Sequence, residues 1–149
     1  MPVVPPPLIA LGAAVVQHRL APGRGTGTGR KLAAVAVTAG SVALMAGALS
    51  RFKANDTTFE PFEPSKASAL VTDGPNALTR NPMYVGMAGL LTAHALFRGG
   101  ILTALPVAGF VAVIDRVQVR PEEEALRQLF GQEYDDYCAA VPRWLSLSR

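Results

Sequence analysis

Charged side chains are unevenly distributed along this 149-residue sequence: they are almost absent from three stretches and crowded into the segments between them. The middle stretch, residues 32–49, contains no charge, is rich in Ala, Val and Leu, and ends at Arg51 and Lys53. Its length suits a membrane-spanning helix, which needs about 20 apolar residues. A charge at the centre of a bilayer costs roughly 2.5–3.5 kcal/mol, so the pattern predicts an integral membrane protein.

A longer apolar stretch, residues 83–114, is interrupted at Arg98, Gly99 and Gly100. Each half is shorter than the ~30 Å hydrocarbon core when wound as a helix. We therefore expect a helical hairpin that turns at the two glycines, has both open ends on one side of the membrane, and extends into the interface.

The first apolar stretch, residues 3–16, begins with prolines that suit the opening of a helix. It lacks the basic segment that precedes the apolar part of a secretory signal, so we expect it to be retained as a first membrane helix. The sequence thus predicts an all-α, multi-pass protein with about four membrane helices. We expect one membrane domain, residues 1–149, in which residues 1–54 form N-terminal helices and residues 55–149 hold the polar clusters.

Apolar side chains recur at helical spacing near the end of the chain, at Leu126, Leu129, Phe130, Tyr134, Tyr137 and Val141. Charged and amide side chains lie largely off this stripe. The pattern predicts a single amphipathic helix that begins at Pro121, lies against the membrane-side body and ends or bends at Pro142.

Composition excludes several classes of function and kinds of site. Charged residues make up 17% of the chain, against about 25% in soluble domains, and the mean hydropathy is +0.27. The net charge is +3, but the basic residues are scattered singly, so we expect no nucleic-acid partner. With only Cys138 there is no intrachain disulfide, and His18 and His94 are too far apart in sequence to predict a metal site. We expect His94 to be a hydrogen-bonded packing residue.

Two polar clusters flank the predicted hairpin: TRNPMYVG at its entrance, residues 79–86, and RPEEEALRQLFGQEYDDY at its exit, residues 120–137. A hairpin brings them to one membrane surface, so Arg80, Asn81 and Tyr84 would face the glutamates. Arg80 as an interface anchor, and the glutamates as helix-dipole partners, are the alternative interpretations.

The helical phase separates the three glutamates. At about 100° per residue, Glu124 points away from the apolar stripe and we expect it to be solvated. Glu122 and Glu123 flank the stripe, where a carboxylate is partly desolvated. They are therefore the better candidates for a site.

The pairing of RNPMYVG, residues 80–86, with EExxLxxxFGxxYxxYxxxVPR, residues 122–143, resembles the isoprenylcysteine carboxyl methyltransferase family. It is also similar to the related phospholipid methyltransferases. The resemblance covers about residues 70–144. Where the family often has Arg-His-Pro, this chain has Arg80-Asn81-Pro82, and Asn cannot carry a proton at neutral pH. The aromatic residue often found after Gly-Pro is Asn76 here.

The resemblance implies a membrane enzyme that binds S-adenosylmethionine between the two motifs and methylates a lipophilic acceptor through a carboxylate, amine or hydroxyl. Arg80 and Glu123 are the catalytic candidates. The implied cofactor-binding residues are Arg80, Asn81, Tyr84, Gly86, Glu122 and Glu123.

The expected partners are a lipid or lipophilic small molecule and the surrounding membrane lipids, with the oligomeric state left open. Because the cofactor is made in the cytosol, we expect the site to face the cytosol. Most Lys and Arg residues then lie on that side, as the positive-inside rule requires. A steroid-reductase-type membrane enzyme that uses NADPH and a non-catalytic small membrane protein are the competing hypotheses.

Overall fold

The computed structural model describes residues 4–21, 26–57 and 67–145, which form helices and turns and contain no strand. The elements in chain order are α1 (Pro6–Leu20), α2 (Thr28–Ala54), the 3-10 turn η2 (Gly74–Ala77), α3 (Pro82–Arg98), the 3-10 turn η3 (Ile101–Thr103), α4 (Ala104–Ile114), the π-turn η4 (Asp115–Val119), α5 (Arg120–Phe130) and α6 (Gln132–Ala140). The all-α fold class expected from the sequence is therefore confirmed for the described residues.

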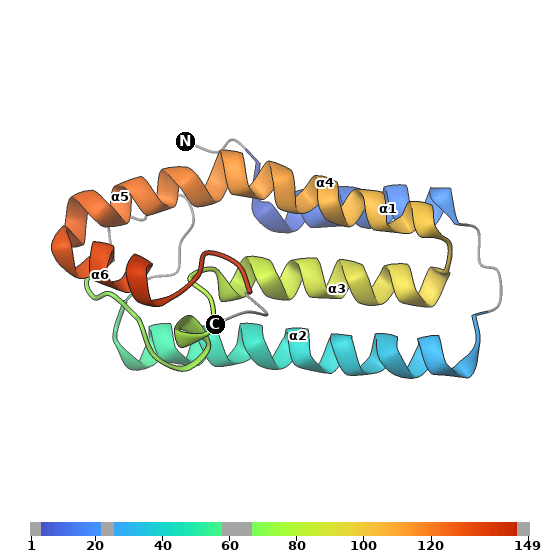
Figure 1. The fold of residues 1–149 in the computed structure, drawn as a ribbon, viewed down its shortest axis with the longest axis horizontal. Helices are drawn as coiled ribbons and strands as arrows, with labels where there is room; N and C mark the ends of the chain where they lie inside the picture. Colours follow the sequence, from blue (N-terminus) through green and yellow to red (C-terminus); the bar gives the residue numbers. More distant parts are fainter. Residues whose placement is uncertain (1–3, 22–25, 58–66, 146–149) are drawn as a thin grey trace.

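The helices form an elongated bundle in which two long helical runs extend past two shorter ones (Figure 1). One long run is α2 and the other is the continuous run from α4 through η4 to α5. The shorter α1 and α3 begin part of the way along these runs. The space beyond their starts is occupied by residues 67–81, α6 and the C-terminal segment, so one end of the bundle has a more complex structure than the other.

Glycines allow α2 and α3 to approach closely. A Cβ at Gly86 would lie 2.2 Å from Met45 Cγ, and one at Gly89 would lie 2.1 Å from Ser41 Oγ. In lipid the hydrophobic effect does not drive helices together, so helix association depends on close packing, which small residues of this kind allow. The contact fixes the position of the α3 start relative to the α2 end.

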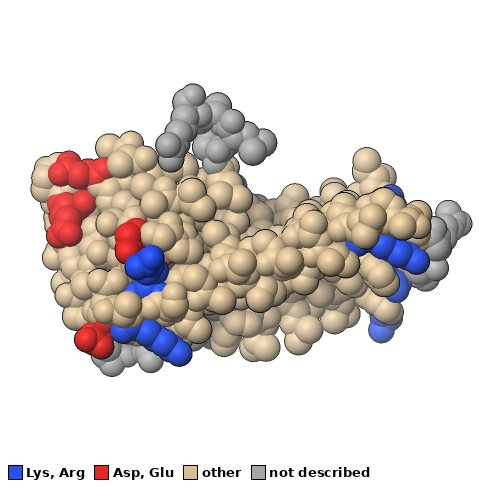
Figure 2. Space-filling view, turned by 90° about the horizontal axis from the view of Figure 1, so that it is seen from below, with Lys and Arg blue, Asp and Glu red and all other residues tan. Residues whose placement is uncertain are grey.

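The surface of the bundle divides into a charge-free middle and two charged ends. Figure 2 shows a wide band without Lys, Arg, Asp or Glu between basic side chains at one end and mixed charges at the other. Large apolar side chains are exposed across this band, among them Leu11, Val35 and Leu105. This arrangement matches a bilayer-embedded middle with both ends in the interfaces.

Two helices in the described residues are long and apolar enough to cross a membrane: Thr28–Ala54 and Ile101–Phe130. The remaining helices of the bundle are shorter, with 15 residues in α1 and 17 in α3. The expectation of about four membrane helices therefore stays a prediction.

The prediction that the C-terminal helix begins at Pro121 is wrong. Helix α4 continues through Pro121 into α5, and the turn before the proline widens into a π-turn in which the Arg120 amide donates to the Asp115 carbonyl. Proline lacks an amide hydrogen and its ring crowds the carbonyl four residues earlier, so a wider turn lets the helix pass it.

The prediction of one amphipathic helix over residues 121–141 is also wrong. The helix ends at Phe130, and Gly131 adopts φ +55° and ψ −124°, a conformation that L side chains rarely adopt. The chain then returns as α6. Most of the predicted stripe still packs together, because Tyr134, Tyr137 and Val141 form a buried cluster with Leu126 and Phe130.

A buried amide ties α1 to α3 near the other end of the bundle. The Gln17 side chain is fully buried and donates to the carbonyls of Leu91 at 3.0 Å and Thr103 at 2.9 Å. Its Oε1 pairs with His94 Nδ1 at 2.8 Å. His94 is therefore hydrogen-bonded within the bundle, as expected.

Candidate functional site

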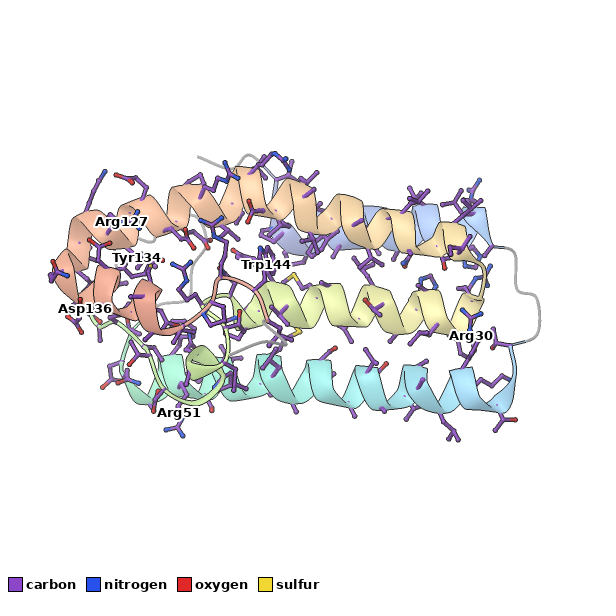
Figure 3. The ribbon with its side chains drawn as sticks, in the orientation of Figure 1. Arg30, Arg51, Arg127, Tyr134, Asp136 and Trp144 are labelled. Atoms are coloured by element: carbon purple, nitrogen blue, oxygen red, sulfur yellow. The ribbon has the colours of Figure 1, made fainter. Side chains whose placement is uncertain are left out.

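A cavity of about 240 Å³ lies at the more complex end of the bundle, where the starts of α1 and α3 meet the end of α2, residues 67–71 and α5. Most of its wall is apolar. The polar residues that line it are Asn76, Arg80, Asn81, Tyr84 and Glu122. Figure 3 shows that Tyr134, Trp144 and Arg51 belong to this end, whereas Arg30 lies at the other.

Asn76 lines the cavity from the turn η2, and Arg80 lines it from the segment that follows this turn. The Leu78 and Thr79 amides both donate to the Pro75 carbonyl, at 3.1 and 3.3 Å. Helix α6 holds this turn in place, because the Tyr137 hydroxyl donates to the Asn76 carbonyl at 2.6 Å. Burial of this hydroxyl raises the pKa of Tyr137 to about 12.

The Arg80 guanidinium is largely buried and already has partners on two of its nitrogens. Nη2 lies 3.3 Å from Glu123 Oε1, and Nη1 donates to the Cys138 sulfur. Its buried Nε has no hydrogen-bond partner among the described residues. Arg80 therefore lines the cavity with an unpaired Nε–H, while Glu123 and Cys138 engage its two terminal nitrogens.

Glu123 lies behind Arg80 and not in the cavity wall. Its two oxygens accept from Arg143 Nε at 2.9 Å and Nη2 at 2.6 Å, and this pairing raises the pKa of Arg143 above its usual value. Arg143 also lies 3.3 Å from Asp115, which accepts from Trp144 Nε1 at 3.1 Å. Arg120 Nε also lies 3.2 Å from Asp115 Oδ2, so three guanidinium groups and two carboxylates form one network of ion pairs that positions Arg80.

Glu122 faces the cavity and has different partners. Its Oε1 accepts from the Tyr84 hydroxyl at 2.7 Å and from the Gln118 amide at 2.5 Å. No ion pair joins it to Lys or Arg in the part of the chain that the structure describes. Glu122 is therefore a half-buried carboxylate, oriented by two neutral donors, that can receive a cation or a hydrogen-bond donor. Glu124 is solvated as expected, with 61% of its side chain exposed.

The other predicted site residues have separate positions. Asn81 lines the cavity. The Arg143 carbonyl accepts from Asn81 Nδ2 at 3.0 Å and from the Thr79 hydroxyl at 2.9 Å. Gly86 faces Met45 and the Ser41 carbonyl of α2 and does not line the cavity. The structure thus brings Arg80, Asn81, Tyr84 and Glu122 to one cavity, with Glu123 paired to Arg80 outside its lining and Gly86 in a helix contact.

Sequence reasoning missed three residues that shape this site. Asp115 and Gln118 lie in η4, between α4 and the second cluster, and no motif includes them. Arg143 is part of the Val-Pro-Arg triplet, but nothing in that triplet indicates a partner. The one available signal was Asp115 itself, an acidic residue directly after a long uncharged stretch.

Comparisons with known proteins place this chain in a family. The bundle has a charge-free middle, as a membrane protein does, and a partly polar cavity at one end. Residues 30–133 match the model of the phospholipid methyltransferase family, and the chain belongs to that family. It is therefore a membrane methyltransferase whose family acts on lipid-related substrates.

The match begins near the start of α2 and ends within the first turn of α6, so it includes most of the cavity wall. The chain is also 40% identical over 63 residues to an uncharacterised protein of Haemophilus influenzae, a match that covers 42% of this chain and all of that protein. No solved structure matches the chain.

Proposed function

We propose that this protein transfers the methyl group of S-adenosylmethionine to a lipophilic acceptor held in the cavity beside Tyr84 and Glu122. The observation that supports this most is the cavity itself. It is apolar over most of its wall, and it is lined by a carboxylate that has no ion-pair partner among the described residues and by a guanidinium whose Nε is unpaired. An apolar wall with a few convergent polar groups is typical of small-molecule sites.

The polar groups suit the functional groups of S-adenosylmethionine. Glu122 can accept from an ammonium or from ribose hydroxyls, and Arg80 Nε can donate to an oxygen. Apolar residues of the wall, such as Met83 and Leu126, can cover the adenine ring. Asn81 and Tyr84 complete the proposed contact set.

Two of the predicted residues act indirectly in this proposal. Glu123 is a positioning residue, because it holds Arg80 while its own oxygens are paired with Arg143. Gly86 holds the start of α3 against α2. Both keep the cavity wall in place without contacting a ligand.

When bound, S-adenosylmethionine supplies a methyl group on a sulfonium, which is a good leaving group. The protein aligns the acceptor with that methyl group and excludes water. Glu122 is placed to take the proton of a hydroxyl or amine acceptor, while Tyr84 and Gln118 fix the orientation of its carboxylate. A carboxylate acceptor would need no base.

We further propose that the end of the bundle with the cavity faces the cytosol. Basic side chains of the described residues lie at that end, among them Arg51 and Arg127 (Figure 3). On this topology α1 and α3 also cross the membrane, with their ends in the interface.

Calorimetric titration in detergent tests the function. We expect S-adenosylmethionine and its product S-adenosylhomocysteine to bind and NADPH not to bind. Glu122→Gln should weaken S-adenosylhomocysteine binding by about tenfold or more, because a charge-assisted hydrogen bond contributes ~1.5–3 kcal/mol. Glu124→Gln is the matched control and should bind like wild type. Binding of NADPH without S-adenosylhomocysteine would instead favour the reductase.

A further inference from the structure

Two buried polar atoms at the cavity wall make no hydrogen bond within the described part of the chain: Asn76 Oδ1 and Arg80 Nε. Asn76 is only 5% exposed, and both residues line the cavity. Folding usually satisfies such groups, because burying an unpaired donor or acceptor is costly. A pair of them on one cavity wall points to a ligand that supplies the partners.

The neighbouring polar groups already have other partners. Tyr137 donates to the main-chain carbonyl of Asn76 and not to its side chain. The two terminal nitrogens of Arg80 point to Glu123 and Cys138. Of the residues that line the cavity, the buried side-chain atoms left without a partner are therefore one acceptor, Asn76 Oδ1, and one donor, Arg80 Nε–H.

Asn76 and Arg80 line the same cavity, so this acceptor and this donor are available to one ligand. A hydroxyl can satisfy both, because it donates one hydrogen and accepts through its oxygen. A carboxylate would accept from Arg80 Nε, but it has no hydrogen to donate to Asn76 Oδ1 and its negative charge would be repelled by that oxygen. An ammonium would donate to Asn76 but would face the Arg80 guanidinium.

We propose that Asn76 and Arg80 form a hydroxyl-binding subsite, in which one ligand hydroxyl donates to Asn76 Oδ1 and accepts from Arg80 Nε. The inference rests on the proposed function, since the hydroxyl belongs either to the ribose of the cofactor or to the lipophilic acceptor. The subsite orients that ligand, and Glu122 remains the group placed to take a proton.

The test measures binding by calorimetry in detergent for wild type, Asn76→Leu and Asn76→Asp. Leu has a similar size but no acceptor, whereas Asp keeps an acceptor oxygen at the same place. The probes are S-adenosylhomocysteine, its 2′-deoxy and 3′-deoxy analogues, and 4-nonylphenol as a lipophilic hydroxyl compound. Asn55→Leu is the matched control, because Asn55 is exposed and lies outside the cavity.

If the hydroxyl is that of the ribose, Asn76→Leu should weaken S-adenosylhomocysteine roughly tenfold to a hundredfold. Asn76→Asp should then retain most of the affinity. One deoxy analogue should bind wild type as weakly as S-adenosylhomocysteine binds Asn76→Leu. Its affinity should fall no further in Asn76→Leu, since the two changes remove the same contact. This comparison of analogues on wild type does not depend on how well the variant folds.

If the hydroxyl is that of the acceptor, Asn76→Leu should leave S-adenosylhomocysteine unaffected and weaken 4-nonylphenol by the same factor. The inference is overturned if Asn76→Leu binds every probe like wild type, or if Asp is as damaging as Leu for each probe. Failure of wild type to bind S-adenosylhomocysteine at all would count against the proposed function, while the phenol titrations would still decide the subsite.

Discussion

Glu122 and Glu123 are adjacent in the sequence but meet different groups in the structure. Glu122 lines the cavity with Tyr84, whereas Glu123 is 6% exposed and joins Arg80 to Arg143. The spacing of the apolar stripe was enough to predict that both are less solvated than Glu124. It could not assign their partners, because these depend on the π-turn before Pro121 and on Arg143, which is 20 residues away.

Replacing Glu123 should destabilise the protein far more than replacing Glu124. Glu123→Gln leaves Arg80 and Arg143 without their shared carboxylate in a buried position, which costs about 3 kcal/mol. Glu124→Gln changes an exposed residue and should cost less than about 0.5 kcal/mol. Thermal unfolding in detergent, followed by circular dichroism, measures both. Equal melting temperatures for the two variants would contradict a stabilising role for this network of ion pairs.

At the scale of the elements, the sequence predicted the helices of the bundle better than their ends. Uncharged stretches and flanking charges located α2, α3 and α4 because these patterns are local. Proline and glycine were the source of the errors at the C-terminal end. Pro121 lies within a helix because a π-turn accommodates it, and Gly131 breaks the stripe because it adopts a positive φ. Neither outcome can be read from the spacing of apolar residues.

The glycine contact between α2 and α3 provides a test at this scale. Gly86→Val should lower stability by about 1–3 kcal/mol, because its side chain would overlap Met45 and approach the Ser41 carbonyl. Gly40→Val on α2 is the matched control, since a Cβ there has no neighbour within 4 Å. The test compares the free energies of unfolding of the two variants in the same detergent. A Gly86→Val protein as stable as Gly40→Val would mean that the two helices do not pack this closely.

At the scale of the whole molecule, the separation of charges into two ends followed from the sequence alone. The bundle places basic side chains such as Arg30 at one end and mixed charges around the cavity at the other. What the sequence could not give is the unequal length of the helices. The long runs extend past α1 and α3, and this overhang creates the space in which the cavity lies.

The proposed topology can be measured with single cysteines. We expect Ser68→Cys and Ala139→Cys to react with a membrane-impermeant maleimide from the cytosolic side, and Thr28→Cys to react from the opposite side. All three positions are outside the core of the bundle, and the parent protein with Cys138 alone is the control. Reaction of Ser68→Cys and Ala139→Cys from opposite sides would rule out the shared surface on which the site depends.

The most direct test of the account is transfer of a labelled methyl group from S-adenosylmethionine into a lipid extract, with the product identified by mass spectrometry. The account predicts a labelled lipophilic product with wild type and with Glu124→Gln. It predicts a rate at least tenfold lower with Glu122→Gln, because removal of a group that accepts a proton costs about 10²–10⁴ in rate when it acts as the base. No labelled product from the folded wild-type protein, or equal rates for Glu122→Gln and Glu124→Gln, would contradict it.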